Sequence, residues 1–335
     1  MIAIRTVALP LAALACAALT ACGGGGGNGS PPGGGGNSGP ASVGPLALGG
    51  DNYDRVISNA AAATAQAGSS GQSANQVLVG ADSRALQWGR LAQAAARLAL
   101  VQPTEPALLL GAATSRACEG SGTVDVVKEG AGANGGLAVD EVVTAHFTAC
   151  VDGFGNRFDG DLKIKLTQLN TQGGVEGMAL KFEGFKAVVD DVSETLDGTM
   201  AIQTLTDLYM LSAPALRIVT ASGGVTQTES WSEFLFTVAT STEGKQLSFG
   251  GQLTSSQLDN HSVEVSTPEA LTFVGEAPSP NSGKVVIKGA NHSVATLTVH
   301  SEVTAVTISV DANGDGTPET SKDVLWQDII GTDLH

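Results

Sequence analysis

From Cys118 to the end of the chain, apolar and polar residues alternate with a period of two in one segment after another. Successive side chains of a β-strand point to opposite faces, so this alternation predicts strands with one apolar and one polar face. The clearest segments are 159–169, 197–205, 247–256 and 282–290. The segments 260–273 and 291–308 both contain Asn-His-Ser-Val near their start and resemble each other as hairpin units. We therefore predict a mainly β domain: an antiparallel meander of about ten to twelve strands, forming an open curled sheet, a partial barrel or a sandwich.

The segment before this domain has a helical pattern instead. Residues 51–67 are rich in alanine, the best helix former, and 83–101 carry a stripe with helical spacing. That stripe consists of Leu86, Arg90, Leu91, Ala94 and Leu98. We expect one or two helices within 51–117, with the stripe packed against a β-domain at 118–335. A flexible link at 68–76 separates the two patterns.

The first residues read as an export signal. Arg5 gives a short positive region, and residues 7–19 give an apolar stretch that is too short for a comfortable membrane span. Leu19-Thr20-Ala21-Cys22 resembles the lipobox of bacterial lipoproteins, which implies removal of residues 1–21 and acylation of Cys22. Cys16 is a rival, but the residues before it fit the pattern less well, and a plain secretory signal peptide is the alternative.

A glycine-rich run follows Cys22 and extends, in our assignment, to residue 50. Such a chain has little to bury and behaves as a coil, with a reach of roughly 25–29 Å between Gly23 and Pro45. We expect a disordered tether that holds the folded part away from a membrane, with the lipid anchor as its membrane contact. If enteric sorting rules apply, Gly23 in place of Asp favours the outer membrane, facing the periplasm or the cell surface.

The charge balance limits the partners that this chain can have. The formal net charge is −16 at pH 7. Nucleic acids and anionic lipid head groups both require Lys/Arg patches, so we expect no nucleic-acid partner and no docking on head groups. The partners that remain are an unidentified protein or envelope ligand and, on an acidic surface, divalent cations.

Two cysteines remain beyond Cys22, and their positions predict a disulfide. Cys118 and Cys150 flank the strand-like stretches 122–127 and 141–149, which are separated by a glycine-rich turn with Asn134-Gly135. A hairpin centred there brings the two sulfurs opposite each other, and an exported chain folds in an oxidising compartment. Zinc is the alternative, although two lone cysteines lack the spacing that zinc prefers.

The sharpest ligand motif is the acidic stretch 311–319. Its oxygen-bearing residues alternate as in a calcium loop: Asp311, Asn313, Asp315, Thr317 and Glu319. However, Lys322 occupies the position of the usual bidentate glutamate, and strands rather than helices are expected on both sides. The alternative is a polar turn between two strands, in which glycines supply positive φ angles. We predict at most a weak calcium site and no other cofactor.

A resemblance to a known group appears in the longer motifs. "CEGSGTVDVV", "HFTACVDGFGNRFDGDLKIKL", "APSPNSGKVVIKGANHS" and "TISVDANGDGTPETSKDVLWQDI" are similar to segments of uncharacterised β-rich lipoproteins from Gram-negative bacteria. The similarity departs from that pattern at Val139-Asp140, where Gly-Asp is more usual. It implies a β-rich fold and an envelope location, and it carries no catalytic residue.

Function is the least constrained property. The chain contains no G-x-S-x-G, H-E-x-x-H or P-loop string. A hydrolase would have to assemble its site in three dimensions, from histidines such as His146, His261 or His300, or from a carboxylate pair such as Asp190-Asp191. We therefore expect a membrane-anchored lipoprotein that presents a non-enzymatic β-rich domain for binding or envelope structure. The alternatives are a secreted hydrolase and a carrier of apolar ligands.

Overall fold

A computed structural model describes most of the chain beyond the first forty residues. The described residues are 42–68, 88–100, 113–129, 137–190, 192–275, 279–300, 305–325 and 329. The chain divides into two compact units, Met1–Ser38 and Gly39–His335, and every described residue belongs to the second. The predicted signal peptide, Cys22 and most of the predicted tether lie outside the described residues.

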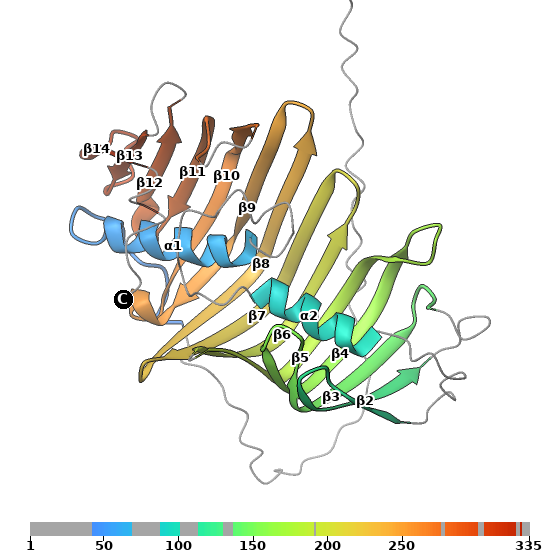
Figure 1. The fold of residues 1–335 in the computed structure, drawn as a ribbon. Coiled ribbons are helices and arrows are strands. Elements are labelled where there is room, and N and C mark those ends of the chain that lie inside the picture. Colours follow the sequence, from blue (N-terminus) through green and yellow to red (C-terminus); the bar gives the residue numbers. More distant parts are fainter. Residues whose placement is uncertain are drawn as a thin grey trace, which may run out of the picture. The chain divides into compact units, whose positions relative to one another are not determined.

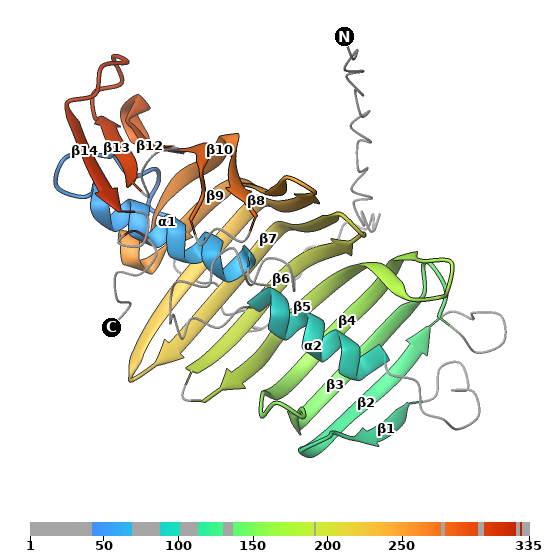
Figure 2. The same ribbon diagram turned by 45° about the horizontal axis from the view of Figure 1, so that its top comes forward.

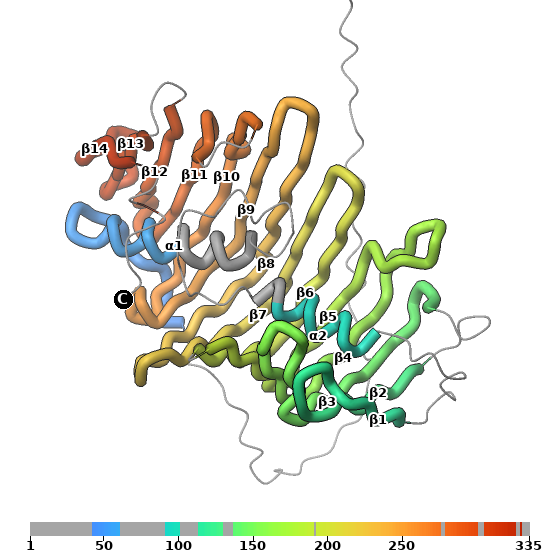
Figure 3. Tube along the Cα trace, in the orientation of Figure 1, coloured from blue at the N-terminus to red at the C-terminus, as the bar shows by residue number. Residues whose placement is uncertain are grey.

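One antiparallel sheet of 14 strands dominates this unit, and its strands follow the order of the chain from β1 to β14 (Figure 1). The strands are β1 Thr114–Ala117, β2 Ser121–Glu129, β3 Val142–Val151, β4 Arg157–Leu169, β5 Val175–Val189, β6 Val192–Thr204, β7 Leu208–Ser222, β8 Val225–Ser241, β9 Gly244–Ser255, β10 His261–Val274, β11 Ser282–Lys288, β12 Val294–Val299, β13 Ala305–Asp311 and β14 Thr320–Leu325. The tube in Figure 3 follows the same consecutive course from β1 to β14.

The predicted fold class, a mainly β antiparallel meander, is confirmed. The strand number is higher than the predicted ten to twelve, and one of the additional strands is the short β1, which ends the region expected to be helical. Of the two expected hairpin units, 291–308 forms two strands, β12 and β13, whereas 260–273 forms the single strand β10. The sheet is open, so neither a partial barrel nor a sandwich forms, because every strand pairs only with its neighbours in the chain.

Two α-helices, α1 Tyr53–Gly68 and α2 Trp88–Leu100, lie on the same face of the sheet (Figures 1 and 2). The side chains of α2 that are most buried are Ala92, Ala95, Ala96 and Ala99. Of the predicted stripe, Leu91 is also buried, and Ala94 and Leu98 are partly buried against the core, so the most buried side of the helix overlaps the predicted stripe. Neither described helix is long and apolar enough to cross a membrane.

The face of the sheet beneath the helices, here called the covered face, carries the hydrophobic core. On β8, Trp231, Phe234, Phe236 and Val238 are buried, and the residues between them are more accessible. Each fully buried large apolar side chain contributes about 1.5–3 kcal/mol. The opposite side, here called the open face, carries the polar residues of the alternation.

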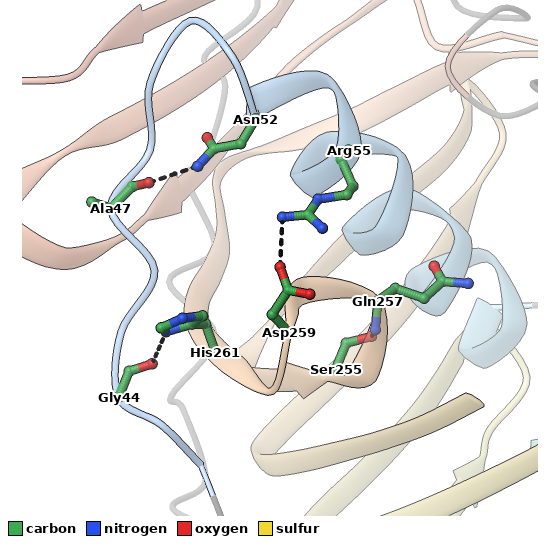
Figure 4. A network of polar contacts seen from close by, with 8 residues as sticks. All are labelled: Gly44, Ala47, Asn52, Arg55, Ser255, Gln257, Asp259 and His261. Atoms are coloured by element: carbon green, nitrogen blue, oxygen red, sulfur yellow. Dashed lines mark hydrogen bonds and ion pairs between the residues drawn. The ribbon is translucent and has the colours of Figure 1, made fainter. Parts of the chain in front are cut away.

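The segment just before α1, residues 43–48, packs along the strand ends and is here called the strap. Val43 N donates to Asn260 O at 3.1 Å, and Leu46 N donates to Ser262 O at 2.9 Å. The imidazole of His261 adds a contact to Gly44 O at 3.2 Å (Figure 4). The described part of the predicted tether is therefore bound to β10, and packed chain begins before the boundary that we placed at residue 50.

Side chains fasten the start of α1 to the same region. Asn52 precedes the helix and donates from Nδ2 to Ala47 O at 2.9 Å, while Arg55 pairs with Asp259 at 3.1 Å (Figure 4). Lys322 of β14 pairs with Asp54 at 2.7 Å. The strap and the first turns of α1 thus join the sheet at β10 and β14.

Candidate functional site

The predicted calcium motif forms the turn between β13 and β14, as the sequence indicated. Asp311 accepts two backbone amides at 2.7 Å, from Gly314 N on one oxygen and Gly316 N on the other. Glu319 accepts Ala312 N at 2.7 Å. The carboxylate oxygens therefore accept hydrogen bonds from backbone amides of the turn itself, and these bonds stabilise its conformation.

The other predicted ligands continue this pattern. Asn313 Oδ1 accepts Asp315 N at 2.8 Å, and Asp315 Oδ1 accepts Thr317 N at 2.7 Å. Within the described ranges, no three His, Cys, Asp or Glu side chains gather in a way that could hold a metal. These contacts support the alternative of a polar turn, and calcium binding stays a prediction.

The predicted disulfide is present. Cys118 and Cys150 are bonded, with their Cα atoms 5.5 Å apart, and β2 pairs with β3 as the predicted hairpin. Asn134-Gly135, the expected turn, lies outside the described residues. A bulge at Ala149, whose φ is 47°, interrupts the register just before Cys150, which is buried. The bond thereby fastens the β1–β2 turn to the core side of β3.

The histidines do not form a catalytic triad in the described structure. His146 donates from Nδ1 to Asp161 at 2.7 Å, on the open face. His300 donates from Nε2 to the hydroxyl of Thr307 at 2.6 Å, and that hydroxyl donates to Asp323. A triad requires the histidine between the hydroxyl and the carboxylate, so this order does not activate the hydroxyl through an imidazole base.

The remaining predicted positions give no site. Asp190 lies at the β5–β6 turn with a φ of 50°, and its neighbour Asp191 is outside the described residues. Cys22 is also outside them, so acylation stays a prediction.

A pair of glutamates that the sequence analysis did not single out lies on the covered face. Glu194 of β6 is 0% exposed and Glu229 of β8 is 9% exposed. β7 runs between their strands, where Glu194 is paired with Thr220 and Glu229 with Ile218. Thr220 and Ile218 are two residues apart on β7 and share a face, so Glu194 and Glu229 are diagonal neighbours across this strand.

The carboxyl groups of this pair have few partners. Both oxygens of Glu194 and Oε2 of Glu229 are buried and have no hydrogen-bond partner among the described residues. The indole Nε1 of Trp231, two residues further along β8, is also buried without such a partner. An unpaired buried polar group costs about 1–3 kcal/mol, and more if it is charged. The neutral, protonated forms of the two carboxyls are therefore favoured.

Burial changes the protonation equilibrium of both groups. It raises the pKa of Glu194 well above the ordinary 4.5, and the nearby charge of Glu229 raises it further. Burial raises the pKa of Glu229 to about 7. Desolvation penalises the charged form because the low-polarity surroundings replace water. Glu229 therefore titrates near neutral pH.

Helix α1 lies near Glu229. Glu229 is paired with Ser255 on β9, and the 3₁₀ turn Ser256–Leu258 follows directly. Asn59 of α1 donates to the side chain of Gln257 in that turn. The middle of α1 therefore packs beside the end of β8 that carries Glu229.

The alternation contained a signal for this pair. Val192, Glu194 and Leu196 share one phase of β6, and Glu229 shares its phase with the buried Trp231. A glutamate in the apolar phase of a strand predicts either a buried carboxyl or a register change, and only the structure distinguishes the two.

Comparison with protein families, with curated proteins and with solved structures gives no match.

Proposed function

We propose that the protein is an outer-membrane lipoprotein, anchored through acylated Cys22, whose β-domain is a non-enzymatic binding scaffold of the cell envelope. The lipobox-like residues before Cys22 support the anchor. The observation that carries the binding role is the open face of the sheet, which none of the described helices covers (Figure 2).

The central part of the open face is rich in hydroxyl and amide groups. Its side chains on β6, β8 and β9 include Ser193, Thr195, Thr199, Thr226, Thr228, Ser230, Ser232, Ser248, Gln252 and Thr254. Cross-strand pairing places Ser230 beside Thr254 and beside Arg217, which lies 3.6 Å from Asp197. A surface of closely spaced donors and acceptors suits a polar partner that forms many hydrogen bonds.

The proposed tether would join the domain through the strap. Backbone hydrogen bonds hold Val43 and Leu46 at the start of β10, among the turns at the strand ends. In this proposal, a chain that leads back to a lipid anchor would join the domain at these turns.

The anchor is tested by fractionation of cells that express Cys22→Ser, with labelled palmitate as a second readout. We expect the variant to lose the label and to move from membranes to the soluble fraction. Cys16→Ser is the matched control and should behave as the wild type. If Cys22→Ser stays in membranes after a high-salt wash, the anchor assignment is wrong.

The binding role is tested by a photo-crosslinking amino acid at Ser230 on the open face. The matched control carries the same group at Gln172, in the exposed β4–β5 turn. We expect a discrete adduct in intact cells from position 230 and none from position 172. Equal labelling from both positions, or none from position 230, would contradict a binding role for the open face.

A further inference from the structure

One phenylalanine is exposed to solvent at the edge of the sheet where the strap joins the domain. Eight of the nine phenylalanines are buried, whereas Phe154, in the turn between β3 and β4, is 93% exposed. We propose that Phe154 inserts into the interfacial layer of the membrane that holds the anchor, so that the domain docks on this membrane by one edge of its sheet. The inference rests on the lipid anchor of the proposed function and adds the surface that the membrane contacts.

The turn holds Phe154 rigidly in its exposed position. One carboxylate oxygen of the buried Asp152 accepts the amides of Phe154 and Asn156, each at 2.9 Å, and the other accepts Nδ2 of Asn156 at 2.8 Å. The amide of Asp152 donates to Asn156 O at 3.0 Å, and the disulfide at Cys150 fixes the strand that leads into the turn. These bonds use the backbone of residue 154 and not its phenyl ring. The turn itself therefore does not require an aromatic residue at this position.

Phe154 shares its edge of the sheet with the strap. In an antiparallel meander every second turn returns to the same edge, which places the β3–β4, β7–β8 and β9–β10 turns together (Figure 1). The strap is bonded to Asn260 and Ser262, at the start of β10. Two more exposed apolar side chains lie on this edge: Val225 at the start of β8 is 60% exposed, and Val43 in the strap is 65% exposed. The edge that receives the chain from the proposed anchor is thus also an edge with exposed apolar groups.

The length of the chain before the strap makes a weak membrane contact effective. Residues 23–42 separate Cys22 from Val43, and a glycine-rich coil of this length has a reach of about 25 Å. An anchored domain is therefore kept at a high local concentration beside the membrane, and docking becomes an intramolecular step. Aromatic side chains favour the membrane–water interface, where an apolar ring is partly removed from water. Phe154 can then hold the edge on a surface that a free domain would leave.

The charges on the same edge determine which head groups it can approach. Glu119, Asp190 and Asp315 are exposed in its turns, and the whole chain has a net charge of −16. Anionic head groups would repel this edge, whereas zwitterionic head groups carry no net charge to do so. The proposed contact is therefore with a zwitterionic surface.

Tryptophan quenching in proteoliposomes tests the contact. The full-length acylated protein is reconstituted in phosphatidylcholine vesicles whose acyl chains carry bromine atoms near the head groups, because bromine quenches tryptophan at short range. Phe154→Trp places the reporter in the turn. Val139→Trp is the matched control, since Val139 is 52% exposed and precedes the opposite end of β3. The wild type, with its three tryptophans, gives the background emission.

We expect the emission added by Phe154→Trp to fall at least about twofold in brominated vesicles, because an inserted side chain reaches the depth of the bromine atoms. The emission added by Val139→Trp should not change. Partial replacement of the lipid by phosphatidylglycerol should weaken the quenching at position 154, and salt should restore it. Both replaced side chains are exposed, and formation of the disulfide checks that the variants fold.

Each other outcome overturns the docking in a recognisable way. Protein that floats with the vesicles but shows no quenching at position 154, or equal quenching at 154 and 139, would remove the docking and leave the anchor. Protein that does not float would remove the anchor and the docking together. Stronger quenching in anionic vesicles would contradict an approach by the acidic edge. A photo-crosslinking amino acid at position 154 that joins a protein and no phospholipid in cells would make a protein the occupant and overturn the membrane contact.

Discussion

Replacing Glu229 with glutamine should stabilise the protein more at pH 8 than at pH 5. An acid whose pKa is raised in the folded state binds its proton more tightly there than in the unfolded chain. This binding favours folding while the group is protonated in both states, and that advantage is lost as the pH rises from 4.5 towards about 7. Above that range the loss is complete and constant.

The magnitude follows from the two pKa values. One pKa unit corresponds to about 1.36 kcal/mol, so the full penalty carried by Glu229 is about 3 kcal/mol above pH 7. Between pH 5 and pH 8, most of it, about 2–3 kcal/mol, develops. Glutamine has nearly the same shape and keeps an unpaired polar end, but it does not titrate. Comparing the two pH values cancels the cost of its amide and isolates the ionisation.

The assay is urea unfolding of the wild type and Glu229→Gln at both pH values. We expect the stability gain of the variant to be larger at pH 8 by about 2–3 kcal/mol. The exposed carboxyl of Glu264 provides the control, since Glu264→Gln should change stability by less than about 0.5 kcal/mol at either pH. An equal effect of Glu229→Gln at pH 5 and pH 8 would refute the raised pKa and the reasoning from burial.

Three further changes test other parts of the structure. Replacing Cys118 and Cys150 with alanine should lower the unfolding free energy by about 3–4 kcal/mol, measured by urea unfolding, and non-reducing mass analysis of the wild type should show their peptides linked. Asp311→Ala should cost about 1–3 kcal/mol, equally in calcium and in chelator, because two amides lose their acceptor. A calcium-specific rise in melting temperature that this variant loses would instead identify a calcium site. Glu141→Ala should cost at least about 1 kcal/mol in the same urea assay, because it removes a partner of Lys128, 2.8 Å away in a largely buried pair; no loss of stability would contradict that role.

Local pattern was sufficient to predict most of the fold. The predicted segments 159–169 and 247–256 coincide closely with β4 and β9, and the cysteine spacing predicted the disulfide. Alternation reports which residues share a face, and hairpin connections leave little choice of pairing. The strap at 43–48 was not predicted, because its glycine and proline content is that of a coil and its order comes from backbone bonds to a distant strand.

The candidate site was harder to predict for a physical reason. The sequence shows that Glu229 shares a strand phase with Trp231, but not that its carboxyl is buried there near the 3₁₀ turn that α1 contacts. The acidic turn posed the opposite problem. Its residues match a metal motif, but the same oxygens accept hydrogen bonds from backbone amides of the turn. The sequence does not distinguish metal binding from this structural role.

The chain-order pairing of the 14 strands makes the sheet a nearly one-dimensional assembly. Each strand exchanges backbone hydrogen bonds only with the strands before and after it, as neighbouring units do in a repeat protein. A hairpin inserted or deleted between two others would leave the pairing of all remaining strands intact. The width of the open face is therefore a property that evolution could change in steps of two strands without building a new core.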